Sequence, residues 1–324
     1  MIHSLSPLTR PIDRPYLTDG GQETTLVFHE GVDLPCFAAF PLLESSHGRD
    51  WFRAYYDRYI DLAERFRTGF VLESATWRAN RDWGARLGYD ASGLERANRA
   101  AIGLLHEIRE RRESPEIPML VSGCVGPRGD GYAAGTAMSA DEAAAYHLAQ
   151  IRSLHDAGAD LITAMTMTSL PEARGVAEAA ASLGVPAVVS FTVETDGRLP
   201  DGHHLRHAIT TIDTTASVPP VYYMINCAHP THFAGRLDPR AEWTRRLGGL
   251  RANASCRSHA ELDASPDLDI GDPRALGAQY RALRDQLPAL HVLGGCCGTD
   301  ERHLAAIGKA CFEIATSSPL LALS

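Results

Sequence analysis

Eight short stretches with the composition of buried strands recur along the chain, and segments with helical periodicity lie between them. The stretches are rich in β-branched and aliphatic residues, and most end close to Gly, Ser, Asn or Asp. They lie at residues 16–19, 69–74, 117–123, 160–166, 186–192, 221–227, 247–254 and 291–295. Eight alternating units in a chain of 324 residues predict a single-domain α/β fold, the (β/α)8 or TIM barrel, over residues 1–324.

The intervening segments favour this barrel over a doubly wound sheet. Residues 50–66 have large apolar side chains at helical spacing, which predicts a helix packed against the barrel. These side chains are Trp51, Tyr55, Tyr59, Leu62 and Phe66. A second helix is predicted to start at the N-cap residue Ser139, whereas residues 257–274 lack a regular period and predict a loop. A doubly wound sheet would need a glycine-rich phosphate turn after its first strand, and TDGGQETTL lacks that pattern.

The charge balance limits the partners that the chain can bind. Its 40 acidic and 31 basic residues give a formal net charge of −9, whereas nucleic acids and anionic membranes need a basic surface. We therefore expect small-molecule partners, no nucleic acid, no membrane, and a monomer or weak dimer. Residues 1–19 lack the apolar core of a signal peptide, and no run approaches the roughly 18 apolar residues of a membrane helix. These features predict a cytoplasmic protein.

The carboxyl ends of the predicted strands are where a (β/α)8 barrel places its chemistry. The polar and reactive residues at these ends are Asp19, Gly20, Gly21, Glu73, Asn226, Cys227, Asn253, Cys296 and Cys297. Three of the seven cysteines thus follow the sixth and eighth strands, which lie close together around one rim. Glycines on both sides of Cys296 and Cys297 permit the sharp turn that both side chains need to reach one point. We expect the three thiols to converge.

Three converging thiolates favour a zinc ion. Zinc binds thiolate sulfur at about 2.3 Å and takes four ligands, so three protein ligands leave one position open. The pair Cys296 and Cys297 alone would also fit buried thiols or a vicinal disulfide, but Cys227 at a second strand end favours zinc. His229 and His232 follow Cys227 and could each replace one cysteine; we expect them instead to line the entrance or face solvent.

A zinc ion with three thiolate ligands suits thiol chemistry better than water activation. The ligands give the site a formal charge of −1, which weakens its Lewis acidity and favours another soft ligand, such as a substrate thiol. That thiol would attack a methyl group on a sulfonium, a quaternary ammonium or an N-methylfolate. A barrel hydrolase or lyase using Glu73 and Asp19 as an acid–base pair, with structural cysteines, is an alternative, as is a non-catalytic zinc-binding or thiol-binding protein.

Five motifs spread over almost the whole chain are similar to those of a known family. They are TDGGQETTL, GCVGPRGDGY, VSFTVETDGRLPDGHHL, INCAHP and LGGCCGTDERHLAAI. The sequence resembles the homocysteine S-methyltransferases, which share a zinc-dependent barrel with betaine–homocysteine methyltransferase and the homocysteine module of cobalamin-dependent methionine synthase. The resemblance implies that Cys227, Cys296 and Cys297 bind zinc and that the product is methionine or a related thioether. It also implies that Asp19, with the Gly20 and Gly21 backbone, holds the amino-acid end of the acceptor, and that Asn226 supports the site.

The length of the chain and one departure from the family pattern bear on the substrates. The betaine-using enzymes carry a longer C-terminal segment, so the length resembles that of enzymes that use S-methylmethionine, a sulfonium donor. The family's fourth strand usually ends in a glutamate that binds the substrate ammonium, and DLITAMTMTSLPEA places Met165 there. We expect either weak homocysteine use supported by another carboxylate near the rim, or a thiol or selenol acceptor without that ammonium. Glu73, Trp77 and Glu194 are the predicted contacts of the methyl donor.

Overall fold

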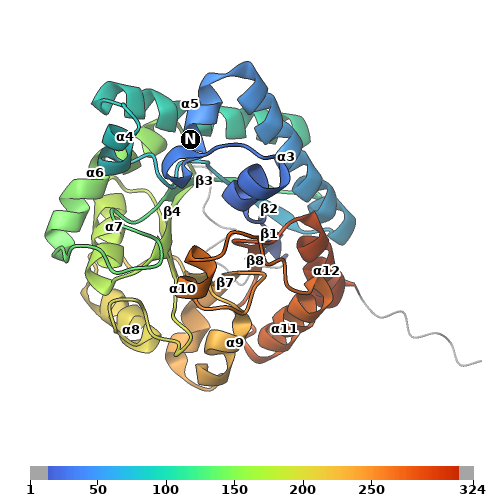
Figure 1. Cartoon of the computed structure of the whole chain (residues 1–324). Helices are drawn as coiled ribbons and strands as arrows, with labels where there is room; N and C mark the ends of the chain where they lie inside the picture. Colours follow the sequence, from blue (N-terminus) through green and yellow to red (C-terminus); the bar gives the residue numbers. More distant parts are fainter. Residues whose placement is uncertain (1–13, 314–324) are drawn as a thin grey trace, which may run out of the picture.

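The protein is a closed barrel of eight parallel strands in a computed structural model that describes residues 14–313 (Figure 1). Each strand pairs with the next along the chain, and β8 pairs with β1 to close the barrel. The strands are β1 (Tyr16–Leu17), β2 (Gly69–Glu73), β3 (Met119–Val125), β4 (Leu161–Met167), β5 (Ala187–Phe191), β6 (Tyr223–Asn226), β7 (Leu247–Ala252) and β8 (Val292–Gly295). All eight predicted strands are present, which confirms the predicted (β/α)8 fold.

An outer ring of helices surrounds the strands (Figure 1). The long helices are α3 (Ser46–Phe66), α5 (Ala91–Arg112), α6 (Ala140–Asp156), α7 (Leu170–Ser182), α8 (Leu205–Thr215), α11 (Pro273–Gln286) and α12 (Glu301–Phe312). The short ones are α2 (Gln22–Thr24), α4 (Arg81–Arg86), α9 (Pro230–Phe233) and α10 (His259–Asp263). Single-turn 3-10 helices lie at Pro35–Phe37, Phe40–Glu44, Ala234–Arg236 and Glu242–Arg246, and a π-helical turn at Thr25–His29. No described helix has both the length and the apolar character of a membrane span.

Both predicted helices form where the sequence indicates. In α3, Tyr55, Tyr59 and Phe66 are buried, so most of the aromatic stripe packs against the barrel as predicted. Ser139 caps α6 through a reciprocal capping box with Glu142. The prediction of one irregular loop over 257–274 is wrong, because it contains α10 and the start of α11. A five-residue helix such as α10 is too short to show a period, although Ser258 and Glu261 form a capping box at its start.

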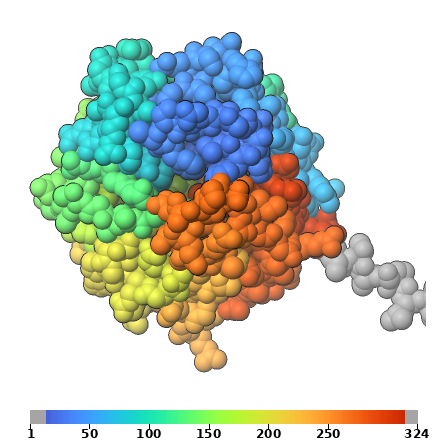
Figure 2. Space-filling model, viewed as in Figure 1, coloured from blue at the N-terminus to red at the C-terminus, as the bar shows by residue number. Residues whose placement is uncertain are grey.

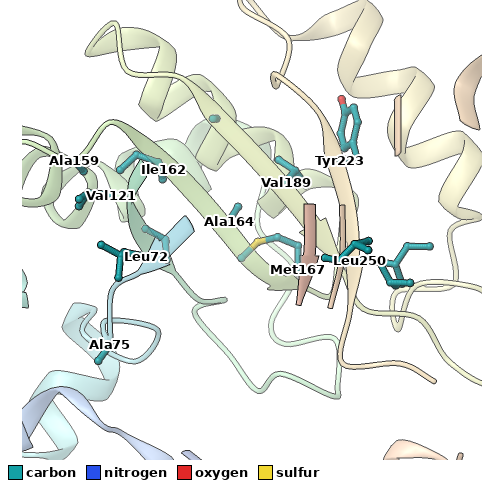
Figure 3. Close-up of a cluster of buried hydrophobic side chains, with 14 of the residues drawn as sticks. Leu72, Ala75, Val121, Ala159, Ile162, Ala164, Met167, Val189, Tyr223 and Leu250 are labelled. Carbon is teal, nitrogen blue, oxygen red and sulfur yellow. The ribbon is translucent and has the colours of Figure 1, made fainter. Parts of the chain in front are cut away.

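Alternate residues of each strand face opposite sides of the barrel wall, and this alternation fills two separate cores. Outward-facing residues such as Leu72, Val189 and Leu250 pack under the helices (Figure 3). Inward-facing residues such as Val71 and Met224 form a smaller cluster inside the barrel. The same alternation turns Glu73, Met165 and Arg251 inward, because each is next to an outward-facing core residue.

The first and last residues of the predicted 1–324 domain, 1–13 and 314–324, lie outside the described part. Most of the N-terminal segment that was predicted not to be a signal peptide, residues 1–19, lies there as well.

Candidate metal and substrate site

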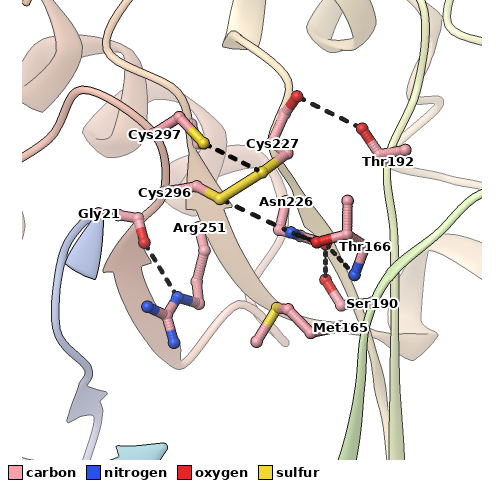
Figure 4. Close-up of a disulfide and its surroundings, with 12 residues drawn as sticks. Gly21, Met165, Thr166, Ser190, Thr192, Asn226, Cys227, Arg251, Cys296 and Cys297 are labelled. Atoms are coloured by element: carbon pink, nitrogen blue, oxygen red, sulfur yellow. Dashed lines mark hydrogen bonds between the residues drawn. A yellow bond between two sulfur atoms is a disulfide. The ribbon is translucent and has the colours of Figure 1, made fainter. Parts of the chain in front are cut away.

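The three predicted thiols meet at the carboxyl ends of β6 and β8 (Figure 4). The Sγ atoms of Cys227, Cys296 and Cys297 all lie within 4.8 Å of one another. The structure joins Cys227 and Cys296 in a disulfide, and Cys297 Sγ lies 3.8 Å from Cys227 Sγ. The disulfide therefore links residues from two strand ends, and the alternative of a vicinal disulfide between Cys296 and Cys297 is wrong.

Local backbone geometry explains why these side chains converge. Cys227 has a left-handed backbone with φ of 51°, which ends β6 in a turn, and its N–H donates to the Arg251 carbonyl at 3.2 Å. Gly294 has no room for a side chain, because a Cβ there would overlap the Thr18 hydroxyl. Gly298 has φ of 78°, so the chain reverses just after the cysteine pair. The predicted need for glycines around the pair is confirmed.

The three thiols fit a zinc ion in number, type and spacing. Two thiolates bound at about 2.3 Å in a tetrahedron have sulfur atoms about 3.8 Å apart. The separation of Cys227 Sγ and Cys297 Sγ, 3.8 Å, is the same. Cys296 could bind in the same way only after reduction of its disulfide. Burial raises the pKa of the Cys297 thiol to about 11, so this thiol is neutral near pH 7 in the metal-free protein.

Two polar side chains, Asn226 and Tyr132, contact the thiols, and Figure 4 shows Asn226 beside Cys296. The Asn226 Nδ2 donates to Thr166 Oγ1 at 2.7 Å and lies 3.7 Å from Cys296 Sγ. Its Oδ1 accepts from the Thr166 N–H at 3.0 Å and from the Ser190 hydroxyl at 2.6 Å. Asn226 thus ties the ends of β4, β5 and β6 together behind Cys296, which is a suitable position for its predicted supporting role. Tyr132, in the loop after β3, donates to Cys297 Sγ at 3.5 Å.

Helix α10 is anchored to the same site through His259. The His259 Nε2–H donates to the Cys227 carbonyl at 2.7 Å, and the ring stacks on Tyr132 with 4.2 Å between centroids. Its Nδ1 lies 3.1 Å from Glu194 Oε1, so Glu194 contacts His259 and lines neither of the cavities described below. His259 and Tyr132 were missed by sequence reasoning. Tyr132 lies in the loop after β3 and His259 begins the short helix α10, and in such connections between strands and long helices spacing does not predict contacts.

His229 and His232 do not take part in the thiol cluster. Both are buried, and the His232 Nε2 bonds to the Cys256 carbonyl at 2.9 Å, whereas the His229 Nδ1 lies 2.8 Å from the Thr231 hydroxyl. Burial lowers the pKa of His229 to about 4. The expectation that they line the entrance or face solvent is therefore wrong. His229 is the N-cap residue of α9, which begins at Pro230, and His232 lies within this helix.

Two cavities open onto the thiols, which we name the inner and the outer cavity. The inner cavity, about 80 Å³, lies inside the barrel mouth. Its walls include the predicted acceptor residues Asp19, Gly20, Gly21 and Met165, together with Glu73, which was predicted to contact the donor but does not line the outer cavity. The outer cavity, about 320 Å³, lies above it between the loop after β3 and α10. Both cavities are lined by Cys227, Cys297 and Trp77. Figure 2 shows this face, where the N-terminal segment in dark blue meets the α10 segment in orange.

A buried ion pair closes the inner cavity. Arg251 Nη2 lies 2.7 Å from Asp19 Oδ1, and the Tyr55 hydroxyl donates to Asp19 Oδ2 at 3.2 Å. Burial raises the pKa of Asp19, and Arg251 opposes that shift. The Gly21 N–H donates to the Thr299 carbonyl at 2.9 Å, so this predicted backbone donor is already used. Arg251 was missed by sequence reasoning, although an arginine inside an apolar strand was a visible signal.

Two further carboxylates face the inner cavity, and each has a raised pKa. Burial raises the pKa of Glu73, whose Oε1 accepts from the Thr163 hydroxyl at 3.1 Å. Burial also raises the pKa of Glu23, in α2, to about 7. Met165 adds an apolar wall from β4, and the Trp77 Nε1 donates to its carbonyl at 3.2 Å. Carboxyl groups and an apolar wall therefore lie next to the thiols.

The fold and the site together define a class of protein: a (β/α)8 barrel whose sixth and eighth strand ends carry three convergent thiols. The model of the homocysteine S-methyltransferase family matches residues 16–311. A homocysteine S-methyltransferase of Escherichia coli strain K12 is 30% identical over 241 residues, covering 68% of this chain and 74% of the relative. The chain belongs to the homocysteine S-methyltransferase family and is a methyltransferase.

Other relatives agree in length and fold. Homocysteine S-methyltransferase 4 of Zea mays is 25% identical, with 92% of this chain and 89% of the relative covered. The metallated form of the homocysteine methyltransferase MmuM from Escherichia coli superposes with a TM-score of 0.70 at 22% identity, over 91% of this chain and 96% of that one. Its oxidized form also gives 0.70, at 21% identity, over 90% and 94%. The predicted family and fold are confirmed, and the hydrolase, lyase and non-catalytic alternatives are set aside.

Proposed function

We propose that this protein transfers a methyl group from a small sulfonium donor, such as S-methylmethionine, to the thiol of homocysteine or a related acceptor, with zinc as cofactor. The observation that carries the proposal is the meeting of two cavities at Cys227 and Cys297. An acceptor in the inner cavity and a donor in the outer cavity would face each other across the thiols. Displacement at a methyl carbon needs such an in-line approach more than it needs acid–base groups.

Cys227, Cys296 and Cys297 would hold the metal once the disulfide is reduced. Bound zinc would lower the pKa of the acceptor thiol, so that the acceptor reacts as a thiolate at neutral pH. The acceptor sulfur forms a bond to the methyl carbon while the bond from that carbon to the donor sulfur breaks. The electron pair of the broken bond stays on the donor sulfur, which becomes a neutral thioether. The acceptor proton passes to solvent.

The outer cavity has the surface that a small cation requires. Trp77 and Tyr132 offer aromatic faces, and Asp130, Asp263 and Asp269 surround them with negative charge. The single arginine among the described walls of this cavity, Arg78, stacks on Trp77 and Trp83, at 4.0 Å and 3.8 Å from the ring centroids, and its charge is paired with Asp130 at 3.8 Å. A sulfonium would lie against the aromatic rings with carboxylates nearby, whereas no phosphate-binding turn is found in the described walls of the cavity.

The test uses reduced, zinc-loaded protein with homocysteine and one donor at a time. S-Methylmethionine, betaine and a methyltetrahydrofolate represent the sulfonium, ammonium and N-methylfolate classes, and mass spectrometry detects methionine. We expect product with the sulfonium and little with the other two. Turnover with betaine or the folate, and none with any sulfonium, would contradict the proposed donor. No methylated thiol with any donor would contradict the proposed function as a whole.

A further inference from the structure

Two polar atoms in the wall of the inner cavity have no protein partner. Glu73 is 6% exposed, and its Oε2 is fully buried without a hydrogen-bond partner among the described residues. The Arg251 Nη2 and Nε donate to Asp19 Oδ1 at 2.7 Å and to the Gly295 carbonyl at 3.0 Å, but Nη1 has no acceptor within the described chain. A buried carboxylate oxygen without a donor is costly, so a ligand group is the natural partner for it.

The positions of these two residues follow from the barrel. Glu73 ends β2 and Arg251 lies in β7, and both side chains point inward into the space that also contains Met165. No ion pair joins them among the described residues, so their charged groups lie more than 4.0 Å apart, and both line the inner cavity. Cys227, Cys296 and Cys297 form another wall of this cavity (Figure 4).

The other charged groups of the cavity cannot take the same role. Asp19 is paired with Arg251 and Tyr55, so it has less capacity for a ligand cation. Met165 offers no charge. Glu23 also lines the cavity without a hydrogen-bond donor among the described residues, but its side chain is only half-buried, whereas the Glu73 Oε2 is fully buried. The cavity thus presents one fully buried carboxylate oxygen that lacks a donor, Glu73 Oε2, and one guanidinium nitrogen that lacks an acceptor, Arg251 Nη1.

We propose that Glu73 binds the ammonium group and Arg251 Nη1 the carboxylate group of a zwitterionic α-amino thiol, whose sulfur reaches the three cysteines. This inference rests on the proposed function and assigns the two residues that recognise its acceptor where the β4 glutamate is replaced by Met165. Met165 then packs against the carbon chain of the acceptor, and its presence on β4 does not mark an acceptor without an ammonium group. Glu73 is then the other carboxylate near the rim that was expected to support homocysteine binding.

The experiment compares homocysteine with 4-sulfanylbutanoate, which lacks only the ammonium group. Binding to reduced, zinc-loaded protein is measured by calorimetry without donor, and KM is measured with S-methylmethionine. We expect the native protein to prefer homocysteine by about 10-fold to 100-fold, the range that corresponds to one charge-assisted hydrogen bond. Glu73→Gln should lose this preference through weaker homocysteine binding, with little change for 4-sulfanylbutanoate.

Glu23→Gln removes the second carboxylate of the same cavity and tests whether Glu23, rather than Glu73, binds the ammonium group; we expect this variant to keep the preference for homocysteine. The double variant Glu73→Gln/Met165→Glu places a carboxylate on the β4 wall of the same cavity, and it should restore part of the preference for homocysteine. Equal binding of the two thiols to the native protein, or loss of the preference in Glu23→Gln alone, would overturn the inference and leave the proposed function intact. The first of these outcomes is measured on the native protein, so it can overturn the inference even if a variant does not fold. If neither thiol binds or is methylated, the proposed function fails, and the inference fails with it.

Discussion

Arg251 and Asp19 form an ion pair of 2.7 Å between β7 and the end of β1, with side chains only 7% and 4% exposed. Through its Nε, Arg251 also bonds to the Gly295 carbonyl, one residue before Cys296. The pair therefore ties three strand ends together at the floor of the inner cavity. A buried ion pair adds little net stability, because removing both charges from water costs about as much free energy as their attraction returns. Removing one partner alone would leave the other as a buried charge without a counter-charge, which is strongly destabilising.

Arg251→Met should destabilise the protein by about 3–5 kcal/mol, because Asp19 would be left as a buried charge without a partner. Asp19→Asn/Arg251→Met, which removes both charges, should recover much of this loss. Urea unfolding measures both values. Arg281→Met is the control, since Arg281 and Asp285 form an exposed pair on α11 and such pairs contribute about 1 kcal/mol or less. If Arg251→Met costs no more than Arg281→Met, the structural importance of the buried pair is refuted.

One zinc ion per chain should bind to the reduced protein, and Cys227→Ala should abolish tight binding. Three thiolates from two strand ends make the site, and two remaining thiols would hold zinc much more weakly. Elemental analysis after dialysis measures the occupancy. Cys256→Ala is the control, because Cys256 is exposed and outside the cluster, and this variant should keep full occupancy. Untreated oxidised protein should bind little zinc until a reductant opens the disulfide between Cys227 and Cys296.

The sequence was sufficient for the parts of this protein that follow regular periods. All eight strands and the meeting of Cys227 with Cys296 and Cys297 could be predicted, because strand ends of a barrel share one rim. The contacts of Tyr132 and His259 could not, because their loops are placed by tertiary packing rather than by local pattern. Arg251 lies between these cases. Its strand was predicted, but nothing in the spacing indicates that it pairs with Asp19 across the barrel.

Trp77→Leu should raise the KM for a sulfonium donor by about 2-fold to 30-fold, the range expected for loss of a cation–π contact. Trp77 lines both cavities, whereas Trp83 also stacks on Arg78 but lines neither. Trp83→Leu is therefore the matched control and should leave the donor KM close to the native value. Steady-state kinetics at saturating homocysteine provide the measurement. Equal effects of the two substitutions would indicate that Arg78 packing matters, and that the Trp77 face does not bind the donor.

Asp300→Asn should destabilise the protein near pH 7, and the difference from the native protein should shrink in acid. Asp300 is buried at the N-cap of α12, where it accepts from the Arg302 N–H at 3.0 Å. Burial alone would raise the pKa of this carboxyl, but the His303 and Arg302 side chains outweigh burial and hold it well below its usual range. Such a lowered pKa means that the unfolded chain binds the proton more tightly than the folded one.

The stability from Asp300 is therefore fully present above the ordinary aspartate pKa of about 4 and is lost as the pH falls below it. At pH 7 the loss in Asp300→Asn should be about 1–3 kcal/mol, the range for hydrogen bonds to a buried charged group. Urea unfolding of both proteins at a series of pH values gives the difference directly, because effects of acid on other groups are common to both. A difference that stays constant from neutral to acidic pH would show that Asp300 acts only as a neutral helix cap.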